Sequence, residues 1–233
     1  MSEPDAGTRA RQLTLELSLE PSFREEDFLL AHSNMVALAT LRRWPHWPGR
    51  RLIITGPPGS GKSHLAAIFA QRAQARVLRA AAIRLADVPA LAHAPALAID
   101  DADIAPIDEA ALFHLLNLMD ERGHFVVMTA KSPPDLWGLR TPDLLSRLRL
   151  SPLAPLGPPD EALVRDVLVK LFADHQLVVE PSVVAWLTRH LERSLGAARA
   201  AVETLDREAL SLGRRVTRPL ASRVLALNDA GEE

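Results

Sequence analysis

A single run of eight residues, 56–63 (GPPGSGKS), has the residue types and spacing that bind phosphate. It fills every fixed position of the pattern G-x-x-x-x-G-K-[ST]. Its glycines let backbone N–H groups wrap a phosphate chain, and the N-terminus of a following helix adds free N–H groups and a positive dipole end. Lys62 would reach the β- and γ-phosphates, and the Ser63 hydroxyl would hold Mg²⁺. The residues expected to contact the ligand here are Pro58, Gly59, Ser60, Gly61, Lys62, Ser63 and His64.

The flanking segments are those that a phosphate-binding loop requires. Residues 51–55 (RLIIT) form a short apolar run that predicts a buried strand, and residues 64–75 are rich in Ala and Leu and predict a helix. A chance glycine-rich turn is the alternative interpretation. The order strand, loop, helix favours the phosphate site.

A second apolar run, residues 96–99, ends in Asp100 and Asp101. Ligands of open α/β sheets bind at the carboxyl ends of strands, so both carboxylates are expected near the loop. Asp100 would hold Mg²⁺ together with Ser63, and Asp101 would orient or activate an attacking water. The alternative is an Asp-rich turn after a strand, since Asp103 continues the run. The preceding phosphate loop favours the catalytic interpretation.

Apolar periodicity predicts strands that alternate with helices, followed by helices alone. The predicted strands are residues 51–55, 76–80, 96–99, 125–129 and 150–153. The predicted helices are residues 33–44, 64–75, 108–122, 144–148, 160–174, 182–192, 195–212 and 219–227. Prolines and a glycine clustered in residues 152–159 indicate a linker between the two parts. We therefore expect a tail (1–22), an α/β domain with a five-stranded parallel sheet and flanking helices (23–156), and a small all-helical domain (157–233).

The composition excludes several classes of protein. Hydrophobic residues make up 48% of the 233-residue chain, which is enough for a core. The net charge of −2 gives no general electrostatic case for nucleic-acid binding, and the absence of Tyr argues against a base-stacking platform. We expect no membrane span, because apolar runs stay shorter than the ~18 residues required. The absence of cysteine and of a signal-peptide core fits a cytoplasmic location.

A set of residues, most of them within these segments, carries a family resemblance. They are Asn34, the segment from Trp44-Pro45 to Pro48, the Gly-Lys-Ser-His form of the loop, the Asp100-Asp101 pair, Asn117, and Thr129 followed by Pro133-Pro134. With them, residues 23–227 resemble the AAA+ domain of the bacterial replication initiator DnaA. DnaA carries a further helix-turn-helix domain after its helical lid, whereas this sequence ends at Glu233. It is similar instead to the Hda group, the regulators of DnaA inactivation.

The resemblance implies a ligand and a docking motif. The ligand would be ADP or ATP with Mg²⁺, its adenine lying between the two domains near Phe28 and Leu29. The Hda group carries a short motif, Q-L-x-L-x-L, that binds the DNA sliding clamp (the beta subunit of DNA polymerase III). Residues 12–17 fit it, and the clamp-binding side chains would be Gln12, Leu13, Leu15 and Leu17. An ordinary edge strand or a solvated tail is the alternative.

The resemblance also implies a catalytic arginine that acts on another subunit. Arg147 stands in the Ser-Arg-Leu frame of the family's arginine finger, with Arg140 and Arg149 as nearby alternatives. Two departures point to weak intrinsic ATPase activity. Lys131 occupies the place of the first-sensor aspartate, and Gly196 that of the second-sensor arginine. Arg199, three residues on, either substitutes for that arginine or is simply solvated.

These features predict a regulator of replication initiation that docks on the sliding clamp and stimulates hydrolysis of DnaA-bound ATP in trans through Arg147. Its expected partners are the clamp, DnaA and, in a homo-oligomer, further copies of itself. We expect no strong direct DNA binding, because residues 81–95 are too few for the helix pair with which DnaA meets single-stranded DNA. Two alternatives stay open: an AAA+ ATPase acting as a helicase-loader-like remodelling factor, and a nucleotide-binding scaffold.

Overall fold

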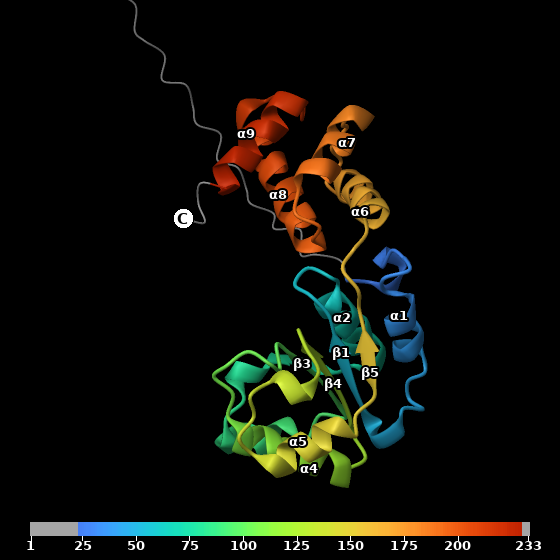
Figure 1. Cartoon of the computed structure of the whole chain (residues 1–233), viewed down its shortest axis with the longest axis vertical. Coiled ribbons are helices and arrows are strands. Elements are labelled where there is room, and N and C mark those ends of the chain that lie inside the picture. Colours follow the sequence, from blue (N-terminus) through green and yellow to red (C-terminus); the bar gives the residue numbers. More distant parts are fainter. Residues whose placement is uncertain (1–22, 230–233) are drawn as a thin grey trace, which may run out of the picture.

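The computed structural model describes residues 23–229. An α/β domain lies at one end of the long axis and a group of four helices at the other (Figure 1). The predicted sheet is confirmed: it has five parallel strands in the order β2-β3-β4-β1-β5. Its strands are β1 (Arg51–Thr55), β2 (Arg76–Arg79), β3 (Ala96–Asp100), β4 (Phe125–Ala130) and β5 (Leu153–Pro155).

The two faces of the sheet bury alternate residues of each central strand, which is why these strands are continuously apolar. Ile53 of β1 and Met128 of β4 pack on the face covered by α4 and α5, together with Leu112. Leu52 and its neighbours pack on the opposite face, against α1 and α2 with Phe69. The helices of this domain are α1 (Met35–Arg42), α2 (Lys62–Ala73), α3 (Val88–Leu91), α4 (Glu109–Glu121) and α5 (Pro142–Arg149).

Several helix boundaries differ from the sequence prediction for local reasons. Helix α1 ends at Arg42 rather than Trp44, because the chain turns before Trp44-Pro45. Helix α2 begins at Lys62, two residues early, directly from the loop. Helix α4 follows Asp108, whose side chain accepts a hydrogen bond from the N–H of Ala111 and caps the helix.

The position predicted for the last strand is wrong. Leu150 and Ser151 finish the turn of α5, since their N–H groups donate to the carbonyls of Arg147 and Leu148. Strand β5 begins only at Leu153, where its pairing with β1 starts. A three-residue strand has no periodicity of its own, so only its partner defines its bounds.

The second part consists of α6 (Glu161–Asp174), α7 (Pro181–His190), α8 (Leu195–Leu212) and α9 (Arg218–Asp229). The prediction of four helices after the linker is therefore confirmed. They enclose an apolar cluster of their own, with Leu168, Phe172, Leu187 and Leu205 at its centre.

Short 3₁₀ turns cover Glu25–Asp27, Pro48–Arg50, Ala80–Ala82, Leu85–Asp87 and Pro134–Leu136. Within residues 23–229, no helix combines the length and the apolar character needed to cross a bilayer.

Candidate functional site

A cavity of about 800 Å³ lies between the α/β domain and the four-helix part. That volume is in the range of small-molecule and cofactor sites, ~300–1,000 Å³. Eight residues predicted to bind the cofactor line it: Phe28, Leu29, Gly59, Gly61, Lys62, Ser63, His64 and Arg199. Two others do not line it, since Pro58 is exposed on the loop and Ser60 is buried beneath it.

The loop owes its shape to glycines in conformations that other residues avoid. Gly59 has φ +67° and Gly61 has φ +99°, both in the left-handed region that a Cβ disfavours. Because Gly61 is followed at once by helix α2, the free N–H groups of the helix's first turn lie at the loop. This arrangement suits a chain of phosphates.

Lys62 folds back on its own loop. Its Nζ donates hydrogen bonds of 2.9 Å to the carbonyl oxygens of Gly56 and Pro57. Burial lowers the pKa of its ammonium group, while the nearby carboxylates of Asp103 and Asp100 partly oppose that shift. The ammonium charge is thus held at the loop and only partly balanced, so an anion placed there gains from it.

Asp100 is fixed by two hydroxyl groups. The Ser63 Oγ donates to its carboxylate across 3.2 Å, and the Thr129 hydroxyl donates to it as well. The N–H of Asp101 in turn donates to Thr129 Oγ1 across 3.1 Å. Asp101 itself is half-buried with φ +56°; its role toward water remains a prediction.

The oxygens of Ser63 and Asp100 fit a magnesium ion. Mg²⁺ binds through one or two protein oxygens, several waters and the phosphates of its nucleotide rather than in an all-protein cage. The described residues hold no group of three or more His, Asp or Glu side chains spaced to bind a metal by themselves.

His64 ties the segment that precedes α1 to the start of α2. Its Nε2 lies 3.0 Å from the carbonyl oxygen of Arg24, and its ring meets Phe23 and Phe28 edge-on, with centroids 5.2 Å apart in each pair. Burial is the main cause that lowers the pKa of His64. The neutral ring therefore serves as part of the cavity wall.

Asn34 shapes the turn that carries Leu29, a role the sequence reading missed. Its Nδ2 donates to the carbonyl of Leu29 and its Oδ1 accepts from the N–H of Ala31, both across 2.9 Å. Its side chain does not cap α1, although it stands at the N-cap position. The only signal in the sequence was its place among the residues of the family resemblance.

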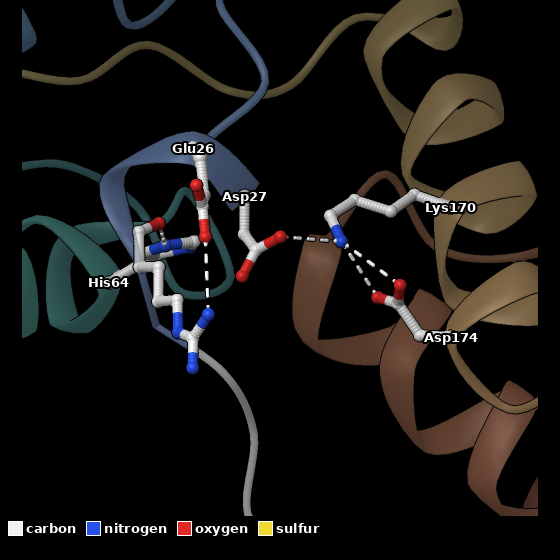
Figure 2. Close-up of polar contacts among 6 residues, drawn as sticks. Glu26, Asp27, His64, Lys170 and Asp174 are labelled. Atoms are coloured by element: carbon white, nitrogen blue, oxygen red, sulfur yellow. Dashed lines mark hydrogen bonds and ion pairs between the residues drawn. The ribbon is translucent and has the colours of Figure 1, made fainter.

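The helical part contributes charge to the cavity, which sequence analysis also missed. Lys170 of α6 contacts Asp27 across 2.8 Å and Asp174 across 2.8 Å, so it links the two parts of the molecule (Figure 2). Burial lowers its pKa, but hydrogen bonds to Asp174 and Asp27 outweigh burial and raise it. No sequence motif marks Lys170 or Asp27. Their ion pair forms only when α6 packs beside the segment 25–27.

The sensor positions have distinct surroundings. Arg199 lies with its Cζ 4.9 Å from the centre of the Phe23 ring and lines the cavity, as does Gly196. Arg199 is thus half-buried beside an aromatic ring at the cavity, and whether it substitutes for the second-sensor arginine stays a prediction. Lys131 has an exposed side chain, and its N–H donates to Asp103 Oδ2 across 2.7 Å.

Arg147 lies far from the loop of its own chain. It belongs to the last turn of α5, at the end of the molecule opposite the helical part (Figure 1). Its Nη1 is 3.5 Å from Asp120 Oδ2, and its Cζ is 5.4 Å from the centre of the Phe113 ring. Of the two alternatives, Arg149 pairs with Asp135 across 2.7 Å, and the N–H of Arg140 donates to Glu109.

The clamp motif, with Gln12, Leu13, Leu15 and Leu17, falls outside the described residues.

Comparisons with known proteins agree with this architecture. A family profile described as "Hda, lid domain" matches residues 162–225. The chromosomal replication initiator protein DnaA of Sphingopyxis alaskensis is 28% identical over 91% of this chain and 52% of its own length. The chain spans about half the length of the curated relatives it matches.

Two solved structures share the fold. Domain III of the Thermotoga maritima replication initiation protein DnaA superposes with a TM-score of 0.74, at 22% identity over 89% of this chain and 97% of that one. The AMPPCP-bound DnaA from Aquifex aeolicus gives 0.65, at 15% identity over 84% of this chain and 69% of that one. The lid profile, the initiator relatives and the shared sheet and lid together support a DnaA-like AAA+ protein of the Hda type.

Proposed function

We propose that this protein is a regulator of replication initiation that stimulates hydrolysis of ATP bound to DnaA, with Arg147 as the arginine finger. The observation that carries the proposal is the separation between Arg147 and its own nucleotide site. Arg51, the first residue of β1, and Arg147 both contact Asp120, whereas the phosphate loop follows the last residue of that strand. At ~3.3 Å per residue, the length of β1 alone puts about 13 Å between the contacts with Asp120 and the start of the phosphate loop.

That separation leaves a partner's nucleotide as the target of Arg147. Its side chain is 38% exposed. Helix α5, which carries it, lies at the end of the molecule opposite the helical part (Figure 1). A guanidinium offered across a head-to-tail contact stabilises the charge that develops on a γ-phosphate, and the gain in rate is ~10³–10⁵. DnaA is the proposed partner because 91% of this chain aligns with an initiator of that name.

The chain's own cavity holds ADP or ATP with Mg²⁺ in this proposal. Support comes from the loop, from the contact between Ser63 and Asp100, and from the AMPPCP bound by the Aquifex aeolicus relative. The nucleotide joins the two parts of the molecule rather than fuelling a motor. Turnover is expected to be slow, because Lys131 and Gly196 cannot act as the aspartate and arginine sensors of the family.

Docking on the sliding clamp through residues 12–17 completes the proposal and brings the regulator to replicating DNA. In this docking, alternate leucines would enter an apolar groove of the clamp, and Gln12 would make directed hydrogen bonds. A cytoplasmic location, where clamp and DnaA are found, belongs to the same proposal.

The test is an assay of ATP hydrolysis on DnaA in the presence of this chain and of clamp loaded on DNA. We expect Arg147→Ala to bind nucleotide and clamp normally but to lose stimulation. Arg147→Lys should show little more stimulation than Arg147→Ala, because an ammonium group lacks the planar, bidentate donor geometry of a guanidinium. Arg149→Ala, which removes an exposed arginine two residues away, is the matched control. Full stimulation by Arg147→Ala would disprove the role in trans, and brisk turnover by the isolated chain would favour a remodelling ATPase.

A further inference from the structure

Three charged residues meet at the end of the sheet remote from the phosphate loop. Arg51 Nη2 lies 3.3 Å from Asp120 Oδ2, and Arg147 Nη1 lies 3.5 Å from the same oxygen. They come from the start of β1, the last turn of α4 and the last turn of α5. Two cations therefore share a single carboxylate, and the cluster carries one excess positive charge.

Arg51 is the confined member of this cluster. Its side chain is only 7% exposed, and its Nε and Nη1 are buried without a hydrogen-bond partner. Among the residues that the structure describes, Asp120 is its one ion-pair partner. A buried cation that loses its counter-charge is costly, so Arg51 holds Asp120 strongly. Burial lowers the pKa of Arg51; Asp120 raises it, and the charge of Arg147 lowers it further.

Arg147 is the more exposed member. Its side chain is 38% exposed, and its contact with Asp120 is the longer of the two. Its other contact is the face of Phe113, with Cζ 5.4 Å from the ring centre. An exposed and shared ion pair contributes little. Arg147 can therefore leave Asp120 for a phosphate at small cost, while Arg51 keeps the carboxylate satisfied.

We propose that Arg51 is a positioning residue for the arginine finger: it competes with Arg147 for Asp120 and so keeps the Arg147 guanidinium available to a partner's nucleotide. This proposal rests on the proposed role of Arg147. A binding site for an anion is the other interpretation of a buried, unsatisfied arginine. It fits poorly here, because the two bare nitrogens are closed to solvent and Asp120 would repel the anion.

The first test replaces Arg51 with methionine, which keeps an unbranched stem and removes the charge. Asp120 then turns wholly to Arg147 and restrains it. We expect the maximal stimulation of DnaA-bound ATP hydrolysis to fall about two- to fivefold, which corresponds to the strength of one surface ion pair. The concentration of this chain that gives half-maximal stimulation should stay unchanged, because the Arg51 side chain is only 7% exposed and adds little to a docking surface. Arg51→Lys keeps the charge and should keep the stimulation.

A suppressor separates this role from a merely structural one. In the double variant Arg51→Met with Asp120→Asn, the carboxylate that would restrain Arg147 is gone, and stimulation should return to the level of the unmodified chain. A structural defect caused by Arg51→Met would not be repaired by a second substitution. The matched control is Arg50→Met, which removes a neighbouring exposed arginine that contacts Gly123 and Phe125 and not Asp120.

Three outcomes would overturn the inference: normal stimulation by Arg51→Met, failure of Asp120→Asn to restore it, or a loss in Asp120→Asn alone as severe as that in Arg147→Ala. The last outcome would mean that Asp120 aims the finger instead of restraining it, and this single variant decides the matter if Arg51→Met does not fold. If Arg147→Ala itself retains stimulation, the proposed function fails. If only Arg147→Ala loses stimulation, this inference alone fails.

Discussion

The N–H of Leu195 donates a hydrogen bond to the carbonyl oxygen of Gly59 across 2.9 Å. This bond joins the four-helix part (α6 to α9, the lid) to the phosphate-binding loop. Leu195 is the first residue of α8, which Ser194 caps by accepting from the N–H of Ala197. The approach is close: a β-carbon on Gly59 would stand 1.9 Å from Ser194 Oγ. Nucleotide bound to the loop is therefore expected to depend on the position of the lid.

The substitution Gly59→Ala should weaken ADP binding by about tenfold or more, which corresponds to ~1.4 kcal/mol. The new methyl group would push α8 away from the loop and open the cavity, in addition to straining a backbone at φ +67°. Titration calorimetry with ADP and Mg²⁺ measures the change.

Gly138→Ala is the matched control for this prediction. Gly138 has nearly the same backbone angle, φ +68°, but a β-carbon there would meet no atom within 4 Å. It should cost ~1–2 kcal/mol in unfolding free energy without changing ADP affinity. Equal losses of affinity in the two variants would show that backbone strain, and not the lid contact, governs binding.

Lys62→Ala should reduce the affinity for ADP and ATP by about 1.5–3 kcal/mol, the range of a charge-assisted hydrogen bond. The variant loses the ammonium that the loop carbonyls of Gly56 and Pro57 hold in place. Lys131→Ala, at an exposed lysine that follows β4, should bind both nucleotides normally. If the unmodified chain shows no heat of binding with either nucleotide, the site assignment is wrong.

Replacing Gln12 and Leu13 with alanine should abolish binding to the sliding clamp and leave the melting temperature nearly unchanged. The motif precedes the residues that form the described apolar clusters, so we expect these clusters not to depend on it. Thr14→Ala with Glu16→Ala is the control, since these residues alternate with the leucines and would face away from the groove. Surface plasmon resonance on immobilised clamp gives the answer, and unchanged affinity in the first variant would rule the motif out.

His64 should make the folded chain less stable in mild acid. Its pKa in the folded chain is lowered, chiefly by burial, so the unfolded chain takes up the proton first as the pH falls. The contribution of the neutral His64 to the free energy of unfolding is complete above the ordinary histidine pKa of ~6.5. It declines as the pH falls below that value toward the lowered pKa of the folded chain. The melting temperature of nucleotide-free protein should therefore fall less steeply for His64→Gln between about pH 7.5 and 5.5.

The exposed His46 provides the comparison for this measurement. His46→Gln should keep the pH dependence of the unmodified chain. The same slope in all three proteins would exclude His64 as the source of the acid sensitivity.

Local patterns in the sequence determined most of the fold. Strand β1 (Arg51–Thr55) and helix α8 (Leu195–Leu212) have the predicted bounds, because an unbroken apolar run and a long amphipathic repeat leave little choice of structure. The phosphate loop was equally easy to recognise, since its glycines and lysine fall within eight consecutive residues. For such features the determining interactions lie within one turn or one strand, and the sequence contains them in full.

Features that join distant segments were decided only by the tertiary structure. The pairing of Lys170 with Asp27 and the sharing of Asp120 by two arginines have no motif, because each needs elements far apart in the chain to pack side by side. Arg51 gave one faint signal, a charge at the start of a buried strand. Its partner could not be read from the sequence: pairing energy depends on distance and burial in space, and these are set by the packing of α4 and α5 against the sheet.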